Sequence, residues 1–359
     1  MHRPRHGHGH DHRAHVNGYD CGRLLGHARA LADPPSVRRN PGSPGHAAAI
    51  AYLEAVLRSE GIAPFDGVSY RYAYVAQRDG AALTNLAARV RGGRAAEPLL
   101  LLGAHFDHLS SSPGADDNAA AVAIVLEVAR ELRAQPPAHD VAIVLYDAEE
   151  PHYFRTADMG SLRFYREVLA ARAERVALPV VLDLCGHDVE DEALADSIML
   201  MGLERSRTLR ALFDRRLESG LPLHPIPVPN GVTGDVSDYH AFRVAGYPFA
   251  FLTCGRWSHY HRASDTVSRL RPSKMAAVAA YVERLLRAAD AALVGRPGCL
   301  EVDGDLTDSW PWFAARLKPL LAVDSTSVEE LLASYRPLMR RIDPGGWGNN
   351  YTLADVLRA

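Results

Sequence analysis

Apolar and polar residues follow two different periods along most of this chain. Short continuous apolar runs occur in "PLLLLGA" (98–104), "VAIVLYD" (141–147), "LPVVLDL" (178–184), "IMLMG" (198–202) and "PFAFLTC" (248–254). Stretches with the apolar spacing of helices lie near 118–133, 160–173, 205–219 and 273–294. Apolar strands that alternate with helices are typical of a sheet with both faces covered. The pattern predicts an α/β fold, doubly wound, with a mostly parallel mixed sheet and helices on both faces.

The two ends of the chain depart from this pattern. Residues 1–42 are rich in His, Arg, Pro and Gly, and we interpret them as a disordered tail and lead-in. "GHAAAIAYLEAVLRSEG" (45–61) predicts a helix, and "VSYRYAYV" and "LTNLAARVRG" predict two strands after it. Short helical stretches with Trp310, Trp312 and Trp347 follow Pro297. The sequence therefore predicts a main domain over 43–296 and a helical C-terminal extension over 297–359.

Composition removes several classes of function. The net charge of −3 over 359 residues gives no global attraction to nucleic acid or to a charged membrane surface. The four cysteines are scattered, without a C-x-x-C pair, which argues against a disulfide framework and a thiolate zinc site. No apolar window approaches the ~18 residues of a membrane span, and the start lacks the apolar segment of a signal peptide. We expect a cytoplasmic protein without nucleic-acid or membrane partners, and leave its oligomeric state open.

Ionisable residues gather where the predicted strands end, the edge at which doubly wound sheets bind ligands. They are His105 and Asp107 after the first run, Asp147, Glu149 and Glu150 after the second, Asp183 in the third, His259 and His261 after the last, and Asp116 and Asp117 at a helix start. A single acid at a helix start is usually a cap, and a single histidine is usually structural. Four strand ends that all converge on charge argue for a shared site.

A divalent cation explains this convergence. Several carboxylates held together without one would repel each other and shift their pKa values upward. Mixed imidazole and carboxylate ligands without a thiolate suit zinc in an open catalytic site, with cobalt or manganese as alternatives. The residues therefore predict a metal site on the carboxyl edge of the sheet.

The same residues carry a resemblance to a known family. "AHFDH", "PGADDNA", "DAEE", "LD" at 182–183 and "HRASDT" occur in the order of the motifs of the two-zinc aminopeptidases, metallopeptidase family 28. That family includes bacterial leucine aminopeptidases, glutamate carboxypeptidase and glutaminyl cyclases. The resemblance covers about residues 45 to 295 and all five ligand motifs.

The resemblance implies two zinc ions and a role for each matching residue. It implies that Asp117 bridges both metals, which sets aside Asp116, and that His261 is a ligand, which sets aside His259. The full set that it implies is His105 and Asp183 on one zinc, Glu150 and His261 on the other, Glu149 as general base, and Asp107 and Asp265 as acids that support the ligands.

One motif departs from the family pattern. Many members carry Ser-Asp-His before the last strand, whereas this chain reads "SDYHAF" (237–242). Tyr239 occupies the histidine position and His240 follows it. Either residue is a candidate donor to the oxyanion or to substrate, and the alternative is that both only begin a helix.

The resemblance implies a zinc exopeptidase that removes N-terminal residues from peptides or hydrolyses a small aminoacyl amide. A glutaminyl cyclase with one working zinc is an alternative on the same scaffold. A carboxypeptidase is another, and Arg155, Arg243 and Arg262 could line its pocket. A non-enzymatic relative would be expected to lose ligands or the base, and this chain keeps Glu149 and all five ligands.

Overall fold

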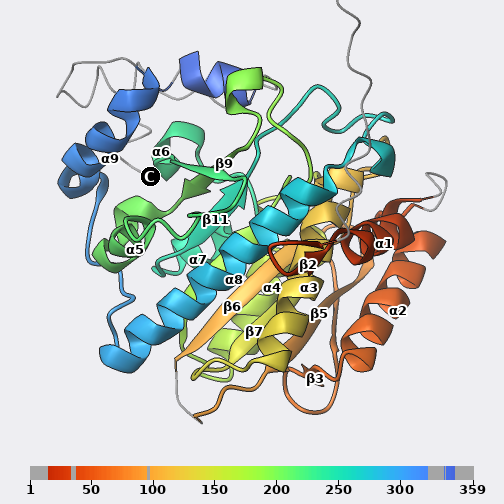
Figure 1. The fold of residues 1–359 in the computed structure, drawn as a ribbon. Helices are drawn as coiled ribbons and strands as arrows, with labels where there is room; N and C mark the ends of the chain where they lie inside the picture. Colours follow the sequence, from red (N-terminus) through yellow and green to blue (C-terminus); the bar gives the residue numbers. More distant parts are fainter. Residues whose placement is uncertain (1–14, 34–37, 95–97, 322–334, 336, 344–359) are drawn as a thin grey trace, which may run out of the picture.

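The computed structural model describes residues 15–33, 38–94, 98–321, 335 and 337–343 (Figure 1). A two-stranded sheet pairs β1 with β2, and a nine-stranded sheet has the order β10-β9-β11-β8-β6-β7-β5-β3, with β4 paired to β5. The strands are β1 His15–Val16, β2 Tyr19–Asp20, β3 Ala63–Pro64, β4 Arg71–Val75, β5 Ala82–Val90, β6 Leu99–His105, β7 Val141–Tyr146, β8 Val176–Leu182, β9 Ser197–Met201, β10 His224–Pro227 and β11 Ala250–Thr253.

The helices lie between these strands. The α-helices are α1 Cys21–Ala32, α2 Pro44–Ser59, α3 Ala121–Ala134, α4 Gly160–Phe164, α5 Arg207–Phe213, α6 Asn230–Thr233, α7 His240–Val244, α8 Pro272–Gly295 and α9 Leu306–Leu321. Two π-helical turns, η1 Ala115–Ala120 and η2 Tyr165–Ala170, precede α3 and follow α4. Three short 3-10 turns are η3 Glu192–Leu194, η4 Leu203–Arg205 and η5 Val267–Arg269.

The centre of the sheet is parallel. Strands β11, β8, β6 and β7 run side by side in one direction, while β5 and β9 pair antiparallel to their neighbours β7 and β11. The chain leaves β6 to form β7 on one side and then returns to form β8 on the other. Strand β6 is therefore the switch point at which an open α/β sheet leaves room for a ligand.

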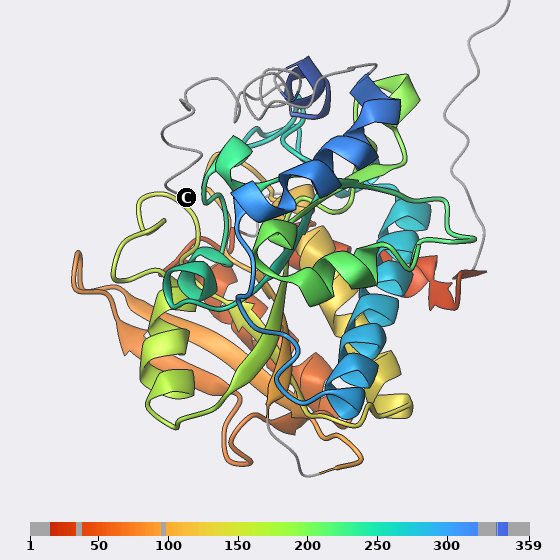
Figure 2. The same ribbon diagram turned by 90° about the vertical axis from the view of Figure 1, so that its left-hand side faces the viewer.

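Helices cover both faces, as the sequence predicts. Helices α1, α3 and α8 pack together on one face, and α4 lies on the opposite one (Figures 1 and 2). Side chains on β6 alternate between the two layers: Leu100 and Leu102 join the core under α3 and α8, whereas Leu99 and Leu101 join the core under α4. Burial on both faces explains why this strand is a continuous apolar run.

The tail predicted over residues 1–42 needs correction for residues 15–33 and also for residues 38–42, where Arg39 is fully buried. Asp20 caps α1 by accepting hydrogen bonds from the backbone N–H groups of Gly22 and Arg23. Leu24, Ala28 and Leu31 recur at helical spacing and are fully or almost fully buried in the main core. A 12-residue amphipathic helix therefore lies in a segment whose basic, histidine-rich composition led to the prediction of a disordered tail. Residues 1–14 lie outside the described part.

Other element boundaries also differ from the prediction. The helix expected over 205–219 is much shorter, because α5 ends at Phe213. The helix expected over 160–173 divides into α4 and the π-helical turn η2. Strand β10, which the hydrophobic pattern does not predict, adds an edge parallel to β9.

The C-terminal helices pack on the main domain. Trp310, Phe313 and Leu317 of α9 are buried in the main core. Residues 337–342 are also helical, and Leu338 and Ile342 bury their side chains in the same core. Trp347 lies outside the described residues. Among the residues that the structure describes, no helix is long and apolar enough to cross a membrane.

Candidate metal centre

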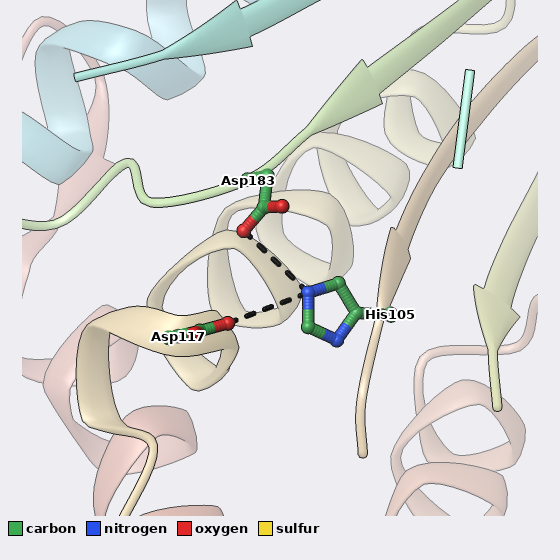
Figure 3. A group of neighbouring side chains, drawn as sticks. All are labelled: His105, Asp117 and Asp183. Carbon is green, nitrogen blue, oxygen red and sulfur yellow. Dashed lines mark ion pairs between the residues drawn. The ribbon is translucent and has the colours of Figure 1, made fainter. Parts of the chain in front are cut away.

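His105, Asp117 and Asp183 form one cluster on the carboxyl edge of the sheet (Figure 3). His105 ends β6, Asp183 directly follows β8, and Asp117 lies in the turn that leads into α3. The Nε2 atom of His105 is 3.5 Å from Asp117 Oδ1 and 3.5 Å from Asp183 Oδ1. All three residues are buried.

A second cluster shares Asp117 with the first. The Nε2 atom of His261 is 3.1 Å from Asp117 Oδ2 and 3.2 Å from Glu150 Oε2. The two oxygens of Asp117 thus face different histidines. His261 has a φ of 58°, a left-handed conformation that is costly for a residue with a Cβ atom and persists only where its surroundings hold it. The structure therefore brings together the five ligands that the resemblance implies.

The donor atoms of these clusters fit a bound cation. His105 Nε2, His261 Nε2, Asp183 Oδ1 and Glu150 Oε1 are buried polar atoms without a hydrogen-bond partner among the described residues. Such atoms are costly unless something bonds them. Burial and the nearby Asp117 carboxylate raise the pKa of Glu150 to about 8, and a cation would relieve that cost. Imidazole and carboxylate donors without thiolate suit zinc.

Carboxylates from neighbouring loops hold the ligand backbones. Asp107 accepts hydrogen bonds from the backbone N–H groups of Glu149 and Glu150, at 3.1 and 3.2 Å. One oxygen of Asp107 also lies 3.4 Å from Nδ1 of His105. This contact fixes the ring so that Nε2 faces the cluster, the usual task of an acid behind a ligating histidine.

Asp265 does the same for the loop that carries the shared aspartate. Its carboxylate accepts hydrogen bonds from the backbone N–H groups of Asp116 and Asp117, at 2.9 and 3.2 Å. Burial and the nearby Asp116 carboxylate raise the pKa of Asp265 to about 7. The loop after β11, which carries His261, therefore positions the turn before α3, which carries Asp117. In the same way Asp107, from the loop after His105, holds the backbone of Glu150 in the second cluster.

Three of the ionisable residues at the strand ends have structural contacts instead. Asp116 accepts hydrogen bonds from the backbone N–H of Gly186 and from Nδ1 of His187. Asp147 pairs with Nε2 of His46 and accepts the backbone N–H of Thr84. His259 binds the Ser264 hydroxyl through Nδ1. These contacts tie the loops of the centre to one another and to the edge of the sheet.

Glu149 lies beside the first cluster without a ligand's geometry. Its Oε2 atom is 3.8 Å from Nε2 of His105, and the side chain is buried. Burial, with the carboxylates of Asp183 and Asp238, raises the pKa of Glu149 well above its ordinary value. A buried carboxylate beside a candidate metal site has the position of a group that accepts and returns a proton.

The two candidate donors in "SDYHAF" have other partners. The Tyr239 hydroxyl donates to the carbonyl of Gly234 at 2.7 Å, and its fully buried ring stacks on Phe249 at 4.6 Å. His240 contacts Asp235 through Nδ1 at 2.5 Å. Of the two open candidates, Tyr239 therefore has its hydroxyl held by the turn at residue 234, and His240 faces the Asp235 carboxylate.

Tyr260 and Asp238 are the polar neighbours of the centre that the sequence analysis misses. The Tyr260 ring stacks on the His261 ring with centroids 3.7 Å apart. Burial and the carboxylates of Asp117, Glu150 and Glu149 raise the pKa of Tyr260 well above its ordinary value, so it stays protonated and can donate. Tyr260 directly precedes a predicted ligand, and Asp238 directly precedes Tyr239, so position in the motif was the available signal.

Known proteins resemble this chain over the same region. A protein from Escherichia coli (strain K12), "Uncharacterized protein YfbL", is 30% identical over 301 residues, which cover 70% of this chain and 92% of that protein. A Porphyromonas gingivalis glutaminyl cyclase has a TM-score of 0.61 at 20% identity, over 75% of this chain and 98% of that one. A leucine aminopeptidase precursor from Bacteroides thetaiotaomicron has a TM-score of 0.59 at 18% identity, over 75% and 97%.

These solved structures share the fold of this chain. The family model described as "Peptidase family M28" matches residues 85–286, a region that holds all five clustered side chains and Glu149. A match over more than half of the chain, together with the relative from Escherichia coli, goes beyond a shared fold. The chain belongs to peptidase family M28.

Proposed function

We propose that this protein is a zinc-dependent exopeptidase that hydrolyses the N-terminal peptide bond of peptides, or the amide bond of a small aminoacyl compound. One observation carries the proposal: two histidine–carboxylate clusters share Asp117, and a separate buried carboxylate, Glu149, lies beside them. An arrangement that only held a structural ion would not need the additional acid.

Each cluster offers three side chains to a zinc ion. His105 and Asp183 would hold one ion, Glu150 and His261 the other, and Asp117 would bridge them through its two oxygens. Cobalt or manganese could take the same ligands. Bound zinc supplies two kinds of chemistry, since it lowers the pKa of a water from 15.7 toward about 7 and polarises a carbonyl oxygen.

Glu149 is the general base in this proposal. It accepts a proton from the attacking water and then delivers that proton to the nitrogen of the leaving amine. Its buried position supports both steps, because burial raises the pKa of the carboxyl and makes it a stronger proton acceptor. Asp107 holds the backbone of Glu149 and so fixes the direction of its carboxylate.

Tyr260 is the donor to the oxyanion in this proposal. Its ring is held against His261, and the carboxylates of Asp117, Glu150 and Glu149 contribute to its raised pKa. A donor aimed at the charge that develops on the carbonyl oxygen is often the largest single contribution in acyl transfer. The free amine of the substrate is attracted by the buried carboxylates, which favours cleavage next to an N-terminus.

Glutaminyl cyclisation is the second candidate, because solved glutaminyl cyclases share this fold. It differs in its nucleophile, since the substrate's own amine attacks in place of water. The carboxypeptidase alternative gains no support from Arg243, whose guanidinium is engaged with the Asp235 carboxylate.

A substrate panel separates these activities. Zinc-loaded protein is assayed with free and N-acetylated aminoacyl anilides and with a peptide that begins with glutamine, beside Glu149→Gln. We expect cleavage of free-amine anilides only, and a loss of kcat of at least about 10²-fold in the variant with its zinc content unchanged. Cyclisation of the glutaminyl peptide without anilide cleavage would replace the proposal by the second candidate. Turnover of neither, with zinc bound, would contradict both.

A further inference from the structure

The end of the described chain lies against the loop that carries His261. Tyr335, Leu338 and Ile342 are buried in the main core, and the Tyr335 hydroxyl donates to the carbonyl of Pro227 at 2.7 Å. Gly255, at the start of that loop, has a φ of 86°, and a Cβ atom there would come within 2.7 Å of the Ile342 carbonyl oxygen. The C-terminal segment and the loop are therefore in close backbone contact.

Asp343 holds Arg256 at three points. Its Oδ1 accepts the backbone N–H of Arg256 at 3.0 Å and the Nε–H at 3.2 Å, and its Oδ2 accepts Nη2–H at 3.3 Å. The Asp343 side chain is fully buried and the Arg256 side chain is 16% exposed. Such a bidentate, largely desolvated pair fixes the orientation of both groups.

Arg256 in turn contacts Tyr260, the aromatic residue next to the ligand His261. Its guanidinium carbon lies 5.6 Å from the centre of the Tyr260 ring, within the range of a cation–π contact. The Tyr260 ring is in turn stacked on His261 at 3.7 Å and 21°. A chain of direct contacts thus runs from Asp343 through Arg256 and Tyr260 to His261, whose left-handed backbone needs such support.

We infer that the C-terminal extension is a working part of the active site: Asp343 and Arg256 are positioning residues that hold Tyr260 and His261 in place for the metal. The match to the family ends at residue 286, so Asp343 lies outside the matched region and Arg256 lies within it. The inference rests on the proposed function in one respect, namely that zinc binds between His261, Glu150 and Asp117.

The test measures zinc affinity in the full chain, by competition with a chelator. Mutation of a residue that supports a metal ligand typically lowers metal affinity 10–100-fold. Asp343 acts through two intermediates, Arg256 and Tyr260, so Asp343→Asn should lower the affinity for one of the two zinc ions about 10-fold. The other ion, beside His105 and Asp183, should keep its affinity. In an Arg256→Gln background, Asp343→Asn should add little, because residues in one chain of contacts are not additive.

Arg341→Gln is the matched control. Arg341 lies two residues earlier, and its Nε is 2.7 Å from Asp191 in an ion pair whose side chains are 44% and 26% exposed. This variant should leave both zinc affinities unchanged. Equal zinc affinities in Asp343→Asn and the unaltered protein, with only a lower unfolding temperature in the variant, would overturn the inference alone. Failure of the unaltered protein to bind zinc would overturn the proposed metal centre and the inference together.

Discussion

Replacement of Arg39 by Met tests how the segment before the main domain supports the loop between His105 and Asp117. Arg39 is completely buried. Its guanidinium donates to the carbonyls of Phe106, Leu31, Pro113 and Gly114, at 2.6, 3.1, 2.9 and 2.5 Å. Three of these carbonyls lie between His105 and Asp117. Gly114 has a φ of 68°, and a Cβ atom there would come within 2.5 Å of the Asp117 carbonyl oxygen, so the loop is tightly folded.

The size of the effect follows from two opposing contributions. Hydrogen bonds from a charged donor contribute about 1.5–3 kcal/mol each, which gives at least about 6 kcal/mol for this set. Burial lowers the pKa of Arg39 from 12.5 to about 10, which corresponds to a cost of roughly 3 kcal/mol for the charged form. Arg39→Met should therefore reduce the free energy of unfolding by about 3–5 kcal/mol, since it also leaves buried carbonyls without donors.

Guanidinium unfolding of the metal-free protein measures this change. Arg39→Lys keeps the charge but offers at most three donors, so we expect roughly half of the loss. Arg38→Met is the control, because the adjacent Arg38 is exposed. A free energy of unfolding for Arg39→Met within about 0.5 kcal/mol of the unaltered protein would show that these hydrogen bonds contribute little, because such a small change is typical of surface positions.

Three further changes test other parts of the structure. Burial alone raises the pKa of Glu127, but hydrogen bonds from His27 and Arg23 lower it to about 2, below its ordinary 4.5. This stabilisation, about 3 kcal/mol, is present above pH 4.5 and lost as the pH falls toward 2. In urea unfolding, the difference in the free energy of unfolding between the unaltered protein and Glu127→Gln should shrink between about pH 5 and 3. Asp265→Asn replaces one acceptor by a donor against two backbone N–H groups, so chelator competition should show zinc affinity about 10–100-fold weaker. Tyr260→Phe removes the proposed oxyanion donor and should lower kcat about 10²-fold with little change in zinc content, and an unchanged kcat would remove Tyr260 from the mechanism.

The sequence predicts the centre of this fold well because the central strands are buried on both faces. The apolar run at 98–104 corresponds to β6 at Leu99–His105, and the run at 141–147 to β7 at Val141–Tyr146. The ionisable residues follow these strands directly, so a parallel arrangement was enough to bring His105, Glu149 and Glu150 to one edge. The full ligand set, including the choice of Asp117 over Asp116 and of His261 over His259, came from the resemblance to the family.

The parts that the sequence does not predict depend on distant contacts. Arg39 binds three carbonyls that are 67 to 75 residues away, and Asp343 binds an arginine 87 residues away. Neither residue lies in a periodic apolar pattern or a motif. Tyr239 stands at a motif position, but Phe249, just before β11, and Phe251, on β11, place its ring in the core. Tertiary packing determines where the Tyr239 side chain lies, and the local sequence does not predict it.

The proposed function rests on two metal ions that share Asp117. Anomalous diffraction at the zinc edge, from crystals of the full chain loaded with zinc, tests it most directly. We expect two peaks about 3.5–4 Å apart, one on each side of the Asp117 carboxylate. A single peak, or two peaks that do not share Asp117, would contradict the account.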